Sequence, residues 1–196
     1  MLKSLVVLMF LLSSTSKAGD LFQNKYILEI NKSLKSITSQ TVKFRQTYKE
    51  KEEVGEIYYK KNKGLFVKYK TSPITILVNQ NSVTYYDSKL NQKSQIPTKD
   101  SASEIFIKPL QINSNNFDLQ SVEDLGEAIK ITAISRKRKD EGIFIMYFSK
   151  KDNILRRVDV KQFEEDSLAR IDLHSHRYKA ISNERFKAIN INKYKI

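Results

Sequence analysis

The chain has 196 residues, which is enough for one domain with a substantial hydrophobic core. It contains no cysteine, and this excludes disulfides, thiolate metal sites and a cysteine nucleophile. The formal net charge of +13 fits a nucleic-acid partner, an anionic membrane surface or simply a lysine-rich exterior, because the basic residues are spread along the whole chain.

The N-terminus has the layout of a secretory signal peptide. Lys3 precedes an unbroken apolar run over residues 5–12, and two small residues follow at the spacing of a cleavage site, the second of them Ala18. The apolar run is far shorter than the roughly 20 residues needed to span a bilayer. We therefore expect a signal peptide over residues 1–18 and a single domain over residues 19–196.

An amphipathic helix is expected next. Apolar residues recur at intervals of three to four positions, and polar residues fill the gaps. The apolar positions are Leu21, Phe22, Tyr26, Ile27, Ile30, Leu34 and Ile37. Asp20 is the candidate N-cap of this helix. Its single apolar stripe predicts that the helix covers an apolar surface.

From residue 41 onward the apolar period changes to two, which indicates β-strands. The alternation predicts strands over residues 41–48, 57–59, 65–69, 74–78 and 83–85. Turn residues, Gly55 and Pro73 among them, are expected to bound these strands. Strands with one apolar and one polar face predict an antiparallel meander that buries one face.

The second half of the chain resumes this pattern after a different middle segment. Residues 101–107 predict a short helix, with Ser101 as N-cap and Glu104 completing a capping box. Further strands are predicted over residues 128–134, 143–148, 154–161 and 168–174, and weak strand or coil over residues 185–194. The basic run 136–139 lies between two predicted strands and is typical of a solvated hairpin loop.

A sheet of this length tends to curl. We expect its concave face to be apolar, lined by Phe44, Ile57, Leu65, Val67 and Ile76. The N-terminal helix is the natural cover for that face. The same residue pattern fits either a filled core or a hydrophobic cavity under the helix.

Residues 55–92 resemble the signature stretch of the LolA family, the periplasmic carriers of outer-membrane lipoproteins. The matching features, in order, are Gly55, Ile57, Tyr59, Lys60-Lys61, Leu65, Val67, Tyr69, Ser72-Pro73, Tyr86-Asp87 and Leu90-Asn91-Gln92. Upstream, Phe44-Arg45-Gln46 resembles the family's Phe-x-Gln on the first strand. The resemblance spans the whole mature chain, although only the general pattern matches after about residue 107.

The resemblance implies a mainly β (α+β) fold, a curved antiparallel half-barrel or incomplete β-barrel with a lid of a few helices over an apolar cavity. In the family a basic residue of the turn, usually arginine, holds the lid shut, and that position falls on Lys61. Lysine offers a compact charge with three donors instead of a planar fork of five, so Lys61 would be a weaker lid latch. The family's turn proline is Asn62 here.

By the same resemblance, the chain is expected to bind lipoprotein acyl chains in its cavity and to carry lipoproteins through the periplasm from the inner to the outer membrane. The implied partners are acylated lipoproteins, an inner-membrane ATP-driven lipoprotein-releasing transporter and an outer-membrane lipoprotein receptor. Residues 60–65 are the candidate partner-binding loop. We expect a monomer without cofactor or enzymatic activity, and the chain has no P-loop motif.

Two functions of other classes remain open. One is a secreted half-barrel domain that senses lipid or protein without carrying it, and the other is a basic nucleic-acid-binding β domain, which secretion disfavours.

The two histidines of the chain raise the question of a metal site. His174 and His176 have H-x-H spacing, which on a regular strand would place both imidazoles and Asp172 on one face. No metal is expected, because Ser175 and Arg177 provide no partner that would orient the imidazoles.

Overall fold

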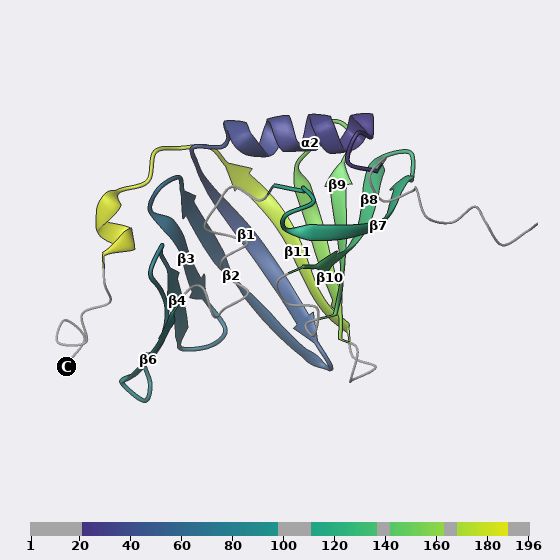
Figure 1. The fold of residues 1–196 in the computed structure, drawn as a ribbon. Coiled ribbons are helices and arrows are strands. Elements are labelled where there is room, and N and C mark those ends of the chain that lie inside the picture. Colours follow the sequence, from purple (N-terminus) through teal and green to yellow (C-terminus); the bar gives the residue numbers. More distant parts are fainter. Residues whose placement is uncertain (1–20, 98–110, 137–141, 163–167, 188–196) are drawn as a thin grey trace, which may run out of the picture.

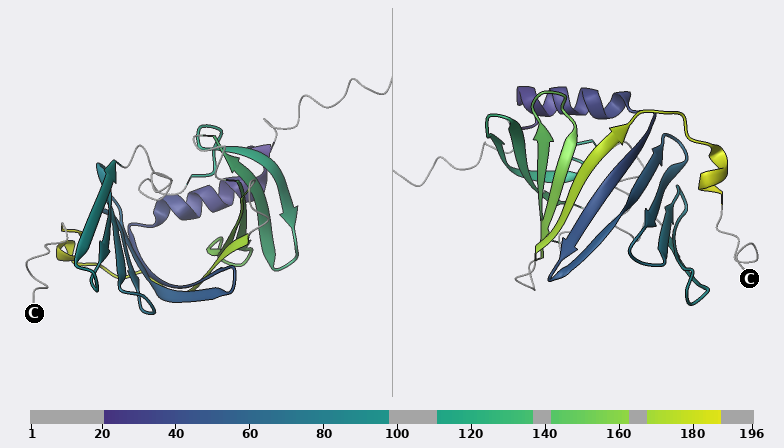
Figure 2. Two further views of the ribbon diagram at one scale, coloured as in Figure 1. Left: turned by 90° about the horizontal axis from the view of Figure 1, so that it is seen from below. Right: turned by 180° about the vertical axis from the view of Figure 1, so that it is seen from behind.

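The computed structural model describes residues 21–97, 111–136, 142–162 and 168–187 (Figure 1). The expected signal peptide, the Asp20 cap and the short helix over residues 101–107 lie outside these residues, as does most of the basic run 136–139. In the described part of the chain, one α-helix lies across the hollow of a long curved sheet (Figure 2).

The described strands form one antiparallel sheet of eleven strands, in the order β6-β5-β4-β3-β2-β1-β11-β10-β9-β8-β7. Their bounds are β1 Ser39–Tyr48, β2 Lys51–Lys60, β3 Gly64–Tyr69, β4 Ile74–Val78, β5 Ser82–Asp87, β6 Gln92–Pro97, β7 Phe117–Asp124, β8 Ala128–Ser135, β9 Ile143–Ser149, β10 Leu155–Lys161 and β11 Leu168–Arg177. The sheet curves without closing on itself (Figure 2). The predicted half-barrel is therefore confirmed.

Two strands, β6 and β7, were not predicted from the alternation. Every residue of β6 is exposed, and its sequence QKSQIP is polar at its first four positions, so it shows no apolar alternation. In β7 the pairing with β8 shifts between Leu119 and Ser121, and this irregularity breaks the period of two.

Gly55 was predicted to bound a strand, and this prediction was wrong. Gly55 lies in the middle of β2, opposite Phe44 of β1. A Cβ added at Gly55 would lie 2.4 Å from the Lys68 carbonyl oxygen and 2.6 Å from the Phe44 ring. Glycine is required here because a ring and a neighbouring strand approach closely. In a single sequence, a glycine needed for close approach cannot be distinguished from a glycine that marks a turn.

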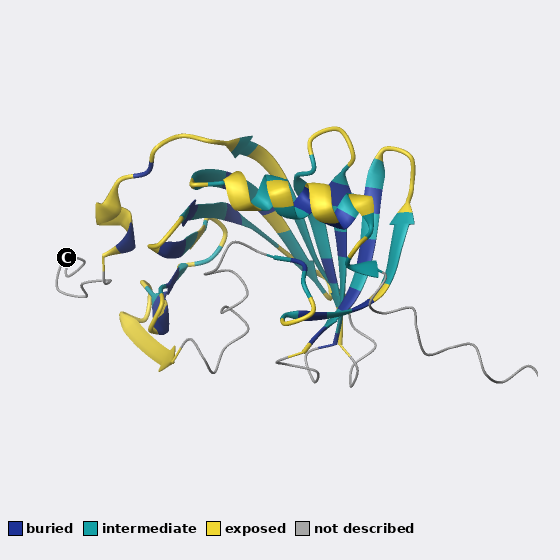
Figure 3. Cartoon of the chain, turned by 45° about the horizontal axis from the view of Figure 1, so that its top comes forward, coloured by how far each residue is buried: buried dark blue, intermediate teal, exposed yellow. Residues whose placement is uncertain are grey.

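The helix α2 runs over Lys25–Ser36. The carboxamide oxygen of Asn24 accepts a hydrogen bond from the backbone N–H of Tyr26 at 2.9 Å, so Asn24 is the N-cap. Ile37 has extended dihedral angles and ends the helix. Ile27 and Ile30 are the buried residues of α2, and both belong to its first half. Figure 3 colours the chain by burial and shows the buried part of the helix in dark blue.

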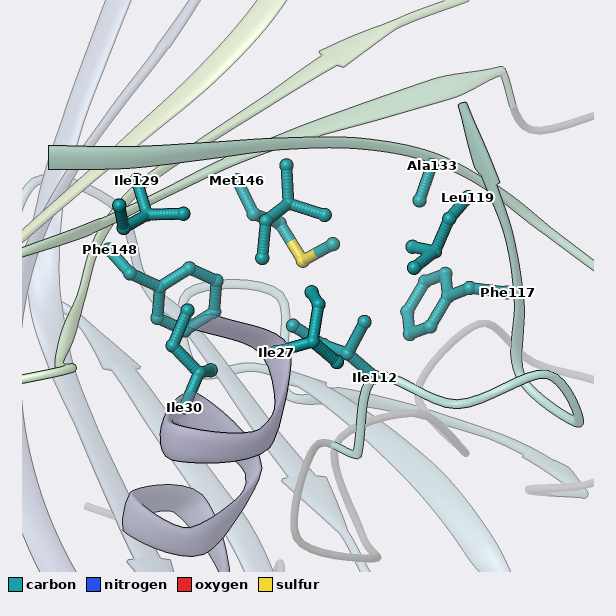
Figure 4. Close-up of a cluster of buried hydrophobic side chains, with 10 residues drawn as sticks. Ile27, Ile30, Ile112, Phe117, Leu119, Ile129, Ala133, Met146 and Phe148 are labelled. Carbon is teal, nitrogen blue, oxygen red and sulfur yellow. The ribbon is translucent and has the colours of Figure 1, made fainter. Parts of the chain in front are cut away.

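The first half of α2 packs against the β7–β9 part of the sheet (Figure 4). The residues of this packed cluster are Ile27, Ile30, Ile112, Phe117, Leu119, Ile129, Ile131, Ala133, Met146 and Phe148. Eight of the ten are no more than 1% exposed, and they form the core that holds the helix in place.

A second, smaller cluster lies on the other face of the sheet. The 3-10 helix η3, Asn183–Phe186, packs Phe186 against Leu77 of β4 together with Ile181. The Arg185 guanidinium lies 3.9 Å from the ring centroid of Tyr58, and Lys60 Nζ donates to the Ile181 carbonyl at 2.7 Å. The described residues thus place one helix in the hollow and one short helix outside it, rather than several lid helices.

Candidate functional site

An apolar cavity lies between the second half of α2 and the concave face of the sheet. Its volume is about 140 Å³. It is lined by Leu34, Ile37, Gln40, Val42, Ile57, Tyr59, Leu65, Asn153, Ile154, Leu155, Leu173 and His176. These residues come from the end of α2, from β1–β3, from β10–β11 and from the turn that precedes β10. Among the described residues, no ionised side chain lines the cavity, so this lining favours uncharged groups.

The five residues predicted for the concave face all lie on one face of the sheet, because Val67 pairs directly with Ile57 and with Ile76, and Phe44 alternates with Val42. Only Ile57 and Leu65 border the cavity itself. Phe44 lies further along β1, where its ring packs edge-on against Tyr69 with centroids 5.2 Å apart. Ile76 packs behind Leu65 in a neighbouring cluster.

Four polar side chains line this mainly apolar cavity: Gln40, Tyr59, Asn153 and His176. All but Asn153 have buried atoms without a hydrogen-bond partner within the described residues. These atoms are Gln40 Oε1, Tyr59 OH, and both ring nitrogens of His176. Burial raises the pKa of the Tyr59 phenol. Burial also lowers the pKa of His176, and Arg156 lowers it further, while a contact with the Leu173 backbone that falls short of hydrogen-bond geometry raises it. Both side chains are therefore held in their neutral forms near pH 7.

The two histidines do not share a face, contrary to the prediction from the H-x-H spacing. Thr41 pairs with Arg177, and Lys43 pairs with His174. Two residues along β1 thus span the same length as three residues along β11, which contains one extra residue. Ser175 takes up the extra residue at φ 53°, in the left-handed region. His176 therefore turns into the cavity, while His174 is exposed.

Asp172 pairs instead with Arg157, with Nε and Oδ1 2.9 Å apart. No group of three or more metal-ligating side chains occurs among the described residues.

The predicted latch, Lys61, lies in the β2–β3 turn beside the end of α2. Its backbone N–H donates to the Thr38 carbonyl at 2.8 Å, while its side chain is exposed and makes no hydrogen bond or ion pair with any described residue. Asn62 has φ 66°, an angle that proline cannot adopt. The turn is thus built differently from the proline turn of the family.

Other polar contacts hold α2 from its beginning as far as Asn31, the seventh of its twelve residues. The Asn31 carboxamide donates to the Ile112 carbonyl and accepts from the Ile112 N–H, both at 2.9 Å. Tyr26 donates its hydroxyl to Asp124 at 2.5 Å, and Lys150 lies 2.7 Å from the same carboxylate. Lys150, followed by Tyr26, lowers the pKa of Asp124. The part of α2 after Asn31, over the cavity, has no comparable attachment among the described residues.

A polar groove adjoins the cavity at the end of α2. It has a volume of about 550 Å³ and shares Ile37 and Ile154 with the cavity. Its other lining residues are Ser33, Ser36, Thr38, Ser39, Asp152, Tyr178, Lys179 and Ala180. Ile37 and Ile154 thus stand between a polar exterior space and an apolar interior one.

Sequence reasoning missed several cavity residues for different reasons. Gln40 continues the alternation of Val42 and Phe44 backwards, so its position could have been found. The strand position of Tyr59 was predicted correctly, but the alternation gave no reason to assign it to a binding site. His176 could not be found, because its orientation depends on the bulge at Ser175.

No family model and no curated protein matches the chain. Among the described residues, no helix combines the length and apolar character that a bilayer crossing requires.

Solved structures match the chain at low identity. An uncharacterized conserved protein from Thermus thermophilus is 15% identical with a TM-score of 0.58, over 84% of this chain and 92% of that chain. A DUF1329 family protein from Desulfovibrio piger is 13% identical with a TM-score of 0.54, over 88% and 98%. A LolA superfamily protein from Nitrosomonas europaea is 9% identical with a TM-score of 0.46, over 83% and 97%. The first two likenesses support the half-barrel fold and extend to nothing beyond it.

Proposed function

We propose that this chain is a periplasmic carrier that shields the acyl chains of lipoproteins between α2 and the half-barrel. The observation that carries the proposal is the apolar cavity under the second half of α2, whose lining within the described residues contains no ionised side chain. Each buried CH₂ of an acyl chain contributes about 0.8 kcal/mol, so an apolar site is what a carrier must offer to a membrane anchor.

The cavity is too small for whole acyl chains while α2 rests on the sheet. Its volume of about 140 Å³ is close to the roughly 150 Å³ of an engineered cavity that binds benzene. Binding of a long chain therefore requires the second half of α2 to move away from the sheet. Cargo that binds the open state better than the closed state shifts this equilibrium by its differential affinity.

The attachments of α2 suit such a movement. Tyr26 and Asn31 tie the beginning and the middle of the helix to Asp124 and Ile112. Leu34 and Ile37 lie over the cavity without comparable polar ties within the described residues. The packed cluster would act as the fixed end and the cavity as the end that opens.

The experiment adds purified protein to spheroplasts of the native host and measures lipoproteins released into the supernatant in complex with it. The blocked variant is Ile154→Trp, which places a large ring at the boundary of cavity and groove. The matched control is Leu125→Trp, at an exposed position of the β7–β8 turn far along the sheet.

We expect release by the wild type and by Leu125→Trp, and at least tenfold less release by Ile154→Trp. If the wild type leaves all lipoproteins on the spheroplasts, the carrier function is refuted. Binding of acylated peptide without any release would instead favour the sensing function.

A further inference from the structure

We infer that the cavity recognises an amide-linked acyl chain, through hydrogen bonds from its neutral amide group to Gln40, Tyr59 and His176. This inference rests on the proposed function, because it assumes that the cavity receives acyl chains. It adds the chemical class of the group that joins the chain to the rest of the ligand.

The first observation is that unpaired polar atoms converge on one place. Five buried side-chain atoms lack a hydrogen-bond partner within the described residues, and four of them line this cavity. A buried polar group without a partner is costly to stability, so such groups are rare and are usually explained by a missing ligand, ion or water. Tyr59 is 7% exposed, so bulk solvent does not satisfy its hydroxyl.

The second observation is the chemistry of these atoms. Gln40 Oε1 can only accept a hydrogen bond, the Tyr59 hydroxyl can donate one, and a neutral His176 donates from one nitrogen and accepts at the other. The complementary ligand group has an acceptor for Tyr59 or His176 and a donor for Gln40. A secondary amide has both, whereas an ester has no donor and would leave Gln40 Oε1 unpaired.

The third observation is that the cavity lining, as far as the structure describes the chain, contains no ionised side chain. A carboxylate or ammonium group would enter without a counter-charge, at a large desolvation cost. The lining therefore selects a neutral head group, as an amide is.

The fourth observation is the adjoining polar groove. It meets the cavity at Ile37 and Ile154 and is lined largely by hydroxyl groups together with Asp152 and Lys179. An amide-linked ligand is apolar on one side of the amide and polar on the other. The cavity and the groove offer a place for each side.

The test measures binding of two soluble probes by calorimetry. The probes are N-methyldecanamide and methyl decanoate, which share the chain and the carbonyl and differ in the amide N–H. We expect the wild type to bind the amide roughly two- to twelvefold more tightly than the ester, because one hydrogen bond contributes a factor of about that size. Gln40→Leu should abolish this preference, and Tyr59→Phe should weaken binding of both probes by a similar factor.

The matched control is Tyr58→Phe. Tyr58 neighbours Tyr59 in β2 but belongs to the cluster on the other face, where its hydroxyl donates to Glu56. We expect no change in probe binding by this variant. Thermal unfolding supplies a second measurement: without ligand, Tyr59→Phe should unfold at a higher temperature than the wild type, because it removes an unpaired buried hydroxyl.

An acylated peptide and a small lipid amide would present the same amide. N-decanoyl-Ser-Ser distinguishes them, because only the peptide reaches the polar groove. Tighter binding of this peptide than of N-methyldecanamide assigns an acylated polypeptide, and equal binding assigns a lipid amide.

Equal affinity of the wild type for amide and ester, unchanged in Gln40→Leu, would overturn the amide inference while leaving acyl binding intact. Undiminished binding by Tyr59→Phe would overturn it as well, since the polar atoms would then be satisfied by trapped water. If neither probe binds, both this inference and the proposed cavity function fall.

Discussion

The two halves of the concave face are covered by the same helix in different ways. Over β7–β9, Ile27 and Ile30 of α2 pack with side chains of three strands in a cluster whose members are all no more than 3% exposed. Over β1–β3, Leu34 and Ile37 face Val42, Ile57 and Leu65 across a cavity of about 140 Å³.

One amphipathic stripe thus serves both as an anchor and as a cover. A packed interior resists changes in side-chain volume, whereas a region with a void gains from added volume. Substitutions of similar size in the two halves should therefore have effects of different magnitude or opposite sign.

The largest effect is expected for Ile30→Ala. Ile30 is fully buried in the packed cluster, so the substitution should lower the free energy of unfolding by about 2–5 kcal/mol. Leu34→Ala, four residues later, borders a void that already exists and should cost about 1–2 kcal/mol. Urea unfolding measures both values. Equal losses would show that the two halves are packed alike.

A pair of enlarging substitutions should act with opposite signs. Ala133→Val adds two methyl groups where the cluster has no room and should destabilise the protein by about 1–3 kcal/mol. Val42→Ile adds one methylene group beside the cavity and should stabilise it by about 0.5–1 kcal/mol. Thermal unfolding of the two variants checks the signs. Destabilisation by Val42→Ile would mean that the cavity cannot accept an added methylene.

Acid should weaken the cavity half through His176. Burial lowers the pKa of His176, so the unfolded chain binds a proton that the folded chain resists. The corresponding stability is present above the unfolded pKa of about 6.5 and is lost as pH falls towards the lower folded pKa. Arg156 and His174 act with burial, whereas Asp152 and the Leu173 backbone oppose it.

His176→Phe should therefore flatten the dependence of the unfolding midpoint on pH between about pH 7 and pH 5. The control His174→Gln alters an exposed imidazole on the same strand and should leave that dependence in place. An equally steep dependence in His176→Phe would assign it to other groups.

The smallest effect on stability is expected for Lys61→Leu. The side chain is exposed, so the free energy of unfolding should change by no more than about 0.5 kcal/mol. If the Lys61 ammonium helps to hold the end of α2, the variant should change the rate of cargo release more than it changes stability. Lys63→Leu, exposed in the same turn, is the control. Identical release kinetics in the two variants would remove the latch role.

The sequence was sufficient for the architecture but not for the cavity. Strict alternation of residues such as Ile57 and Leu65 predicts which side chains share a face, and a long antiparallel sheet must curl. Whether a shared face is filled depends on the fit of side chains from distant segments, as in the contact of Ile30 with Phe148, and alternation carries no information about that. The bulge at Ser175 is equally hidden, because nothing local to His176 distinguishes it from His174.

The pairing of β1 with β11 has a consequence for the order in which the molecule folds. Phe44 lies opposite Leu173, so the centre of the sheet joins segments from opposite ends of the chain. The hairpins from β1 to β5 join residues that are close in the sequence. The edge of β1 that faces away from β2 stays unpaired until β11 pairs with it. The cavity beneath the second half of α2 is lined by residues of both segments. It is therefore complete only after β11 has paired with β1. Ligand binding in this cavity therefore requires both segments to be in place.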